Sequence, residues 1–195
     1  MKMRWLTTAA MVAAIGIAPA VSLAQTAAPA TDKAEKRASD KSALPSGDKK
    51  FVMEALKGGM AEVELGKLAS EKASNDAVKQ FGQRMADDHA KAGDELKKIA
   101  QDKGVQPPAG LDSKHQKLRD RLAKLSGPDF DRAYVSEMVK DHRKDVKEFQ
   151  REAEKAKDPD VKSFAAKTLP TLQDHLKQIE SLQTQVKGQA KAEKK

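Results

Sequence analysis

Three of the four histidines in this chain share one local setting, in which an aspartate directly precedes a histidine inside a stripe of apolar residues. The pairs are Asp88-His89, Asp141-His142 and Asp174-His175. Around the first pair, Met85 and Ala92 continue the stripe. Residues three and four positions apart share one face of a helix. We therefore expect each pair to point at, or beside, a core lined by helices.

A glutamate, Glu62, belongs to the same group of candidate ligands. It is the only charged member of a stripe of small residues at heptad spacing. The stripe consists of Ala55, Gly59, Glu62, Gly66, Ala69 and Ala73. Glycine inside a helix costs about 1 kcal/mol relative to alanine. The glycines at positions 58, 59 and 66 therefore predict that backbone or bulky side chains approach this helix closely.

The four candidate side chains are predicted to lie at one depth. At a rise of about 1.5 Å per residue, His89 lies about 20 Å from the start of its helix, and Glu62 about 18 Å before the same turn. His142 lies about 20 Å into its helix, and His175 about 24 Å from the opposite turn. In helices of about 40 Å, these positions all fall near the middle.

Imidazoles with a carboxylate at one level predict a site for a transition-metal ion, because neutral histidine and glutamate are good ligands for zinc, copper or iron. An aspartate beside each histidine could orient a ring from outside the site. The predicted ligands are Glu62, His89, His142 and His175, and the predicted orienting residues are Asp88, Asp141 and Asp174. The alternative is a buried polar layer without metal, in which aspartates and histidines satisfy one another by hydrogen bonds. The protein would then be a stress or protein-interaction bundle of the cell envelope, with an unknown partner.

Di-iron redox catalysis is disfavoured by the same residues. Di-iron sites in four-helix bundles use Glu-x-x-His from two helices together with further glutamates. The residues three positions before the candidate histidines are Ala86, Val139 and Leu172, and none of them is a ligand. The residues thus favour a non-enzymatic or weakly catalytic protein over an oxidase or peroxidase of the ferritin-like type. No phosphate loop or haem-attachment motif is present, so we expect no organic cofactor.

Helical periodicity predicts the elements that position these residues, and strand-like alternation is absent. The expected helices cover residues 49–72, 76–103, 113–125, 127–157 and 158–187. The 113–125 helix lies within a long connection between the second and third of the four long helices. This pattern predicts an all-α, ferritin-like four-helix bundle of two helical hairpins with a long, partly helical crossover.

The two predicted hairpins resemble each other in sequence. Residues 72–81 echo residues 155–164 across the tight turn of each hairpin. In the same alignment, Phe51 takes the position of Tyr134. Two related hairpins packed face to face would bury one common core.

The N-terminus has the form of a secretory signal peptide, residues 1–24. Lys2 and Arg4 precede an apolar run over residues 6–21, and Ser22-Leu23-Ala24 supplies small residues before the cleavage point. A membrane anchor is the alternative, but the run is shorter than the ~20 residues of a spanning helix. We therefore predict a periplasmic or secreted protein with no transmembrane span after processing.

The rest of the chain divides by composition. Residues 25–47 contain almost no large apolar side chain and are predicted to be a disordered linker. Residues 48–187 form the predicted bundle, and residues 188–195 a basic disordered tail. Loss of Lys2 and Arg4 with the signal peptide lowers the formal net charge from +8 to +6. Nucleic acid is not expected as a partner, because only 4% of residues are aromatic and could stack on bases.

Four stretches together resemble a known bacterial family. They are residues 58–69 (GGMAEVELGKLA), 78–89 (VKQFGQRMADDH), 138–142 (MVKDH) and 169–175 (LPTLQDH). The resemblance is to an exported, ferritin-like family known only as a domain of unknown function, number four-one-four-two, and it covers about residues 48–184. It implies a ferritin-like bundle in the cell envelope. It brings no established activity, so the ligand assignment rests on the residues themselves.

Overall fold

The computed structural model describes residues 43–192 of the chain. Within this range it contains helices and no strand, which confirms the all-α class. The helices are α1 (Ser46–Lys72), α2 (Asp76–Asp102), α3 (Ser113–Ala123), α4 (Gly127–Lys155) and α5 (Pro159–Ala192). None of these helices is long and apolar enough to cross a membrane. The predicted signal peptide and residues 25–42 of the predicted linker lie outside the described residues.

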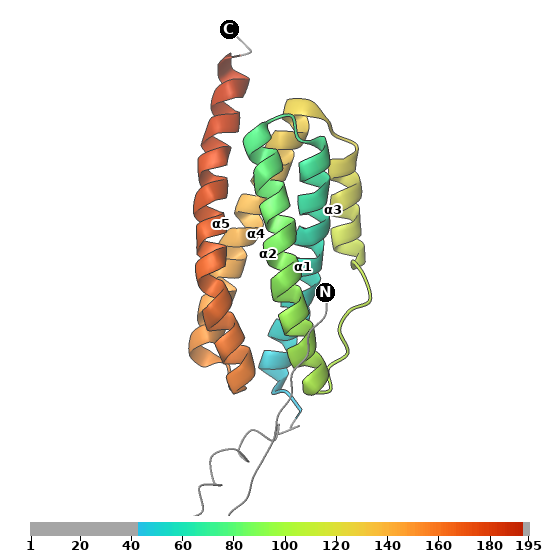
Figure 1. Cartoon of the computed structure of the whole chain (residues 1–195), viewed down its shortest axis with the longest axis vertical. Coiled ribbons are helices and arrows are strands. Elements are labelled where there is room, and N and C mark those ends of the chain that lie inside the picture. The colour runs from blue at the N-terminus through green and yellow to red at the C-terminus, as the bar shows by residue number, and fades with distance from the viewer. Residues whose placement is uncertain (1–42, 193–195) are drawn as a thin grey trace, which may run out of the picture. The chain divides into compact units, whose positions relative to one another are not determined.

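The four long helices form a bundle of two antiparallel hairpins, α1 with α2 and α4 with α5 (Figure 1). Helix α2 ends at one end of the bundle, and α4 begins at the other. The connection between them therefore runs the length of the bundle, and its helix α3 packs alongside α1. The predicted arrangement of two hairpins with a partly helical crossover is confirmed.

The helix ends follow local signals in the sequence. Asn75 caps α2, because its side-chain oxygen accepts hydrogen bonds from the amides of residues 77 and 78. Gly104, two residues after the end of α2, has φ +68°, and Gly127 at the start of α4 has φ +57°. Helix α5 continues to Ala192, which is beyond the predicted end of the bundle at residue 187.

The core consists of two apolar clusters on either side of the level of the histidines. One includes Leu65, Phe81 and Met138, and the other includes Phe51 and Phe164. In every long helix, one cluster comes from residues before the candidate ligand and the other from residues after it. Burial of this apolar surface holds the helices together. The candidate ligands therefore form a polar layer between two apolar regions.

Each hairpin contributes one buried aspartate that accepts hydrogen bonds from the turn of the other hairpin. Asp131, at the start of α4, accepts hydrogen bonds from the amides of Ser74 and Asn75 in the α1–α2 turn, at 3.0 and 2.9 Å. Asp48, at the start of α1, accepts from the amides of residues 157–158 in the α4–α5 turn, at 2.9 and 2.6 Å. Both aspartates stand three residues before the equivalent aromatic positions of the sequence duplication. The internal repeat therefore places these two sets of hydrogen bonds at equivalent positions in the two hairpins.

The glycines of α1 serve different purposes. A Cβ atom at Gly66 would lie 2.6 Å from the backbone oxygen of Gly82 on α2, so the predicted close approach of helices occurs here. At Gly58, however, a Cβ would meet nothing within 4 Å, and at Gly59 only the Nδ1 atom of His89, at 4.0 Å. The prediction of close packing is therefore wrong at Gly58, which faces open space, whereas at Gly59 the side chain of His89 approaches only to ordinary contact distance.

Candidate metal centre

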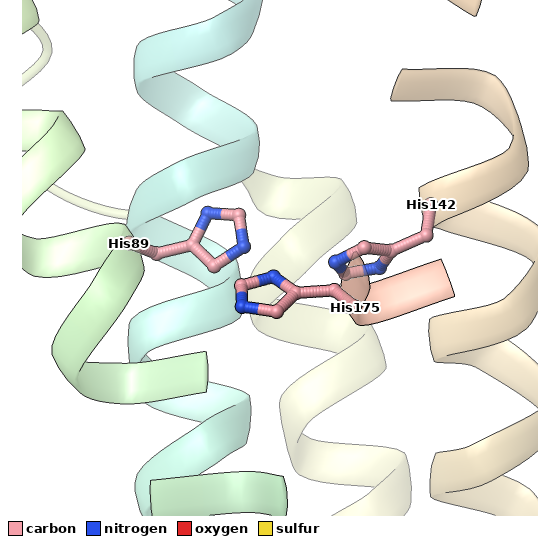
Figure 2. Close-up of side chains that lie close together, drawn as sticks. All are labelled: His89, His142 and His175. Atoms are coloured by element: carbon pink, nitrogen blue, oxygen red, sulfur yellow. The ribbon is translucent and has the colours of Figure 1, made fainter. Parts of the chain in front are cut away.

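Three histidines from three helices meet inside the bundle. His89 comes from α2, His142 from α4 and His175 from α5, and the rings face one another (Figure 2). One ring nitrogen of each lies within 4.8 Å of those of the other two. The ring centroids are 5.5 to 5.7 Å apart. The exposed fractions of the three residues are 8%, 0% and 1%, so the cluster is shielded from bulk solvent.

Each ring has one nitrogen on its outer side that is engaged by an oxygen atom. The three contacts are His89 Nδ1 to Glu62 Oε2 at 3.1 Å, His142 Nδ1 to the carbonyl oxygen of Met138 at 3.0 Å, and His175 Nε2 to Asp88 Oδ2 at 3.0 Å. A carbonyl oxygen and an ionised carboxylate only accept hydrogen bonds. The outer nitrogens of His142 and His175 therefore carry the ring protons and donate them outward, and that of His89 does so when Glu62 is ionised.

The remaining nitrogens are left with lone pairs. They are His89 Nε2, His142 Nε2 and His175 Nδ1, and all three are buried without a hydrogen-bond partner in the protein. Buried polar atoms are normally satisfied, so three unsatisfied acceptors in one cluster call for a cation or for bound donors. The arrangement is that of metal-binding histidines, whose other ring nitrogen donates to a carboxylate or a backbone carbonyl.

The electrostatic environment keeps the rings neutral. Burial, together with the neighbouring rings of His142 and His175, holds the pKa of His89 well below its ordinary value. Burial and the proximity of His175 lower the pKa of His142 to about 4, although the hydrogen bond to Met138 acts in the opposite direction. Burial also lowers the pKa of His175, against the raising effect of Asp88. Neutral imidazoles at pH 7 are the form that binds metal.

Glu62 lies at the outer side of the cluster. Its Oε2 atom contacts His89, and its Oε1 atom lies 3.6 Å from His142 Nδ1 without forming a hydrogen bond. Burial first, and then the negative charges of Asp145 and Asp141, raise the pKa of Glu62 well above its ordinary value. The structure thus places Glu62, predicted as a ligand, where it orients a ring. The cluster that could hold an ion, among the described residues, consists of the three histidines.

The three predicted orienting aspartates have different surroundings. Asp88 accepts the proton of His175, which is on the other hairpin, and is also held by Arg84 at 3.3 Å. Burial would raise the pKa of Asp88, but these hydrogen bonds and charges lower it. Asp174 forms an ion pair with Arg84 at 2.7 Å and is mostly exposed. No hydrogen bond in the described part of the chain joins Asp141 to a histidine.

Sequence reasoning missed three groups that shape this centre. Arg84 forms an ion pair with Asp88, which lies four residues later on α2. This spacing could have revealed the pair in the sequence. The carbonyl of Met138 orients His142, but a backbone acceptor leaves no signature in side-chain patterns. Burial, with the charges of neighbouring carboxylates, raises the pKa of Asp145 to about 7 although Lys144 opposes the shift. Asp145 could have been found by its position three residues after His142.

Comparison with known proteins agrees with a helical bundle of this class. The chain matches the family described as "Domain of unknown function (DUF4142)" over residues 22–182. It belongs to that family, which confirms the resemblance found in the sequence. No curated protein matches the chain.

Two solved structures are similar in fold. A DUF305 fragment from Deinococcus radiodurans has a TM-score of 0.64 and 14% sequence identity, over 73% of this chain and 99% of the fragment. The protein CopM, in a structure described as the Cu(II)-bound form, has a TM-score of 0.60 and 18% identity, over 71% of this chain and 96% of CopM. At these identities the similarity shows a common helical-bundle fold.

Proposed function

We propose that this protein binds one transition-metal ion through His89 Nε2, His142 Nε2 and His175 Nδ1. The observation that carries the proposal is the direction of the ring protons. With Glu62 ionised, all three outer nitrogens have acceptors, so three lone pairs are left inside a buried cluster with no donor from the protein. A bound cation would satisfy all three acceptors at once.

The distances fit such an ion after a small adjustment. Two nitrogens bound to one ion at 2.0–2.1 Å lie about 3.3–3.6 Å apart in tetrahedral or trigonal geometry. The 4.8 Å limit on the nitrogen separations is about 1.2–1.5 Å larger. Modest rotation of the imidazole rings would close this difference. Glu62 and Asp88, which hold two of the rings, would place negative charge near the ion.

Copper and zinc are the metals that this donor set favours. Imidazole suits both, and in a given nitrogen site copper(II) generally binds more tightly than zinc(II). The likeness to CopM, described as Cu(II)-bound, supports testing copper first. With the predicted signal peptide, these points lead us to propose a metal-binding bundle of the cell envelope that is not an enzyme. The predicted ferritin-like relationship is part of the same proposal.

The test is the metal content of the purified protein. We expect about one copper or zinc per chain to remain after loading and desalting, and mass spectrometry measures it. The double variant His142→Ala/His175→Ala should lose this metal. His115→Ala is the matched control, because His115 is the one remaining histidine and lies on α3.

Circular dichroism would show that the double variant still folds as a helical bundle. Retention of one metal per chain by a folded double variant would refute the proposal. Failure of the wild-type protein to retain metal, with a melting temperature unchanged by copper and zinc, would favour the alternative of a structural polar layer in an interaction protein.

A further inference from the structure

Two hollows meet beside the histidine cluster. The crossover groove is an open hollow of about 400 Å³ between α1, α2 and the crossover, and it reaches Gly110 and Leu111. The inner cavity is a smaller space of about 70 Å³ that is lined by residues of all four long helices. Gly59, His89 and Gly93 line both hollows. One of the proposed ligands is therefore adjacent to a solvent-connected space.

Glycines keep this region open. A Cβ at Gly58 or Gly93 would meet nothing within 4 Å, so neither position is glycine because of close packing. Each glycine inside a helix costs about 1 kcal/mol relative to alanine. Side chains at Gly59 and Gly93 would extend into the hollows beside His89. Their absence leaves a window in the wall formed by α1 and α2.

A buried acceptor without a partner faces the same space. Glu62 lines the inner cavity and is only 4% exposed, and its Oε1 atom has no hydrogen-bond partner in the protein. A site of about 10–15 Å³ is enough for one water, so the inner cavity has room for small molecules. A water in this cavity could donate a hydrogen bond to Glu62 Oε1. This observation is independent of the glycines.

The number of protein ligands also favours a free coordination position on the metal ion. Only the three imidazoles form a cluster that could hold an ion among the described residues. Sites with three protein ligands keep a position for water or another exogenous molecule, whereas structural sites are filled by four protein ligands. Glu62, which could have been a fourth ligand, instead holds the outer nitrogen of His89.

From these observations we infer that the metal centre keeps one coordination position for a small exogenous ligand, water or a monodentate anion, which arrives through the window at Gly59 and Gly93. The inference rests on the proposed function, because it requires the metal ion. It adds that the bound metal is open to small molecules. Its ligand class is limited by the small volume of the inner cavity.

The probe is azide, added to the purified protein loaded with copper(II). We expect a new azide-to-copper charge-transfer absorption band and a changed electron paramagnetic resonance spectrum. Gly93→Leu fills the window, so stopped-flow absorption should show azide association slowed about tenfold or more while copper content stays the same. Gly93→Ala adds only a Cβ and should have a smaller effect. Gly188→Leu, at another helical glycine with open space, is the control for helix propensity and should bind azide like the wild type.

Copper content is measured before azide is added, which separates the two hypotheses. A wild-type protein that retains no copper refutes the proposed function. A copper-loaded wild type whose spectra do not respond to azide has a closed coordination sphere, which overturns the inference. Equal rates of azide association in Gly93→Leu and wild type overturn the access route through the window.

Discussion

His175 on α5 donates a hydrogen bond from Nε2 to Asp88 on α2, at 3.0 Å, and thereby joins the two hairpins at the level of the histidine cluster. Asp88 therefore orients a ring of the opposite hairpin. Its sequence neighbour His89 turns to Glu62 on α1. The two members of one Asp-His pair thus act on different parts of the same centre.

Removal of this acceptor should weaken metal binding. In Asp88→Ala, the Nε2 proton of His175 loses its partner and the ring is free to change tautomer or rotate. Loss of such an orienting carboxylate typically lowers metal affinity about 10- to 100-fold. Competition with a chromophoric chelator would measure the change. Asp87→Ala is the control, since Asp87 is exposed and bonds only to Gln83, and an equal loss in both variants would contradict the role of Asp88.

The metal-free bundle should lose stability on mild acidification, in part through His142. Its pKa is about 4 in the folded protein, and about 6.5 is normal for an unfolded chain. As the pH falls from about 6.5 to about 4, the unfolded state binds a proton that the folded state does not, so the free energy of unfolding falls by at most about 1.4 kcal/mol per pH unit from this group.

Urea unfolding of the wild type and of His142→Gln at several pH values would isolate this contribution. The variant starts less stable, but its stability should depend less steeply on pH between about 4 and 6.5. Parallel curves for the two proteins would show that His142 is not kept neutral by the fold.

Gly66→Ala should destabilise the bundle. The new Cβ would lie 2.6 Å from the backbone oxygen of Gly82, and backbone cannot move as a flexible side chain can. Separation of α1 from α2 should cost about 1–3 kcal/mol. Gly58→Ala is the matched control on the same helix, because its Cβ enters open space, and it should be neutral or stabilising by up to about 1 kcal/mol. Thermal unfolding would compare the two, and equal melting temperatures would contradict the close contact.

Loss of either aspartate that fastens a turn should destabilise the fold. Asp131→Ala and Asp48→Ala each remove the acceptor of two backbone amides that are partly or fully buried, at a cost of about 1–3 kcal/mol per unsatisfied group. Asp129→Ala is the control, because Asp129 is close in sequence but mostly exposed. Chemical denaturation would measure the differences. A change within about 0.5 kcal/mol in both variants, as is usual for surface positions, would refute the role of these hydrogen bonds.

The fold and the level of the histidines could be predicted because both follow from regular helix geometry. A fixed rise per residue and readable turns at Asn75 and Gly104 determine how deep each side chain lies. His89, His142 and His175 therefore reach one layer in the structure as expected. The correspondence between the hairpins was also visible in the sequence.

The division of roles within the centre could not be predicted, because it depends on which helix faces which. Asp88, Asp141 and Asp174 are alike in sequence, yet only Asp88 lies opposite a ring of another helix. The depth of Glu62 was predicted, but the side of the ring that it contacts depends on how α1 packs against α2. Gly58 and Gly66 likewise look equivalent, and only Gly66 meets the backbone of a neighbouring helix.

The hydrogen bonds that Asp48 and Asp131 accept from opposite turns make each hairpin depend on the other. A fragment that stops before α4 contains the amides of Ser74 and Asn75 but not the carboxylate that receives them. The same holds for a fragment that starts after α2, which lacks Asp48. Neither half alone satisfies the amides of its own turn, so we expect the two hairpins to stabilise each other when they dock. A single cut in the crossover would therefore leave two pieces that need each other and hold together.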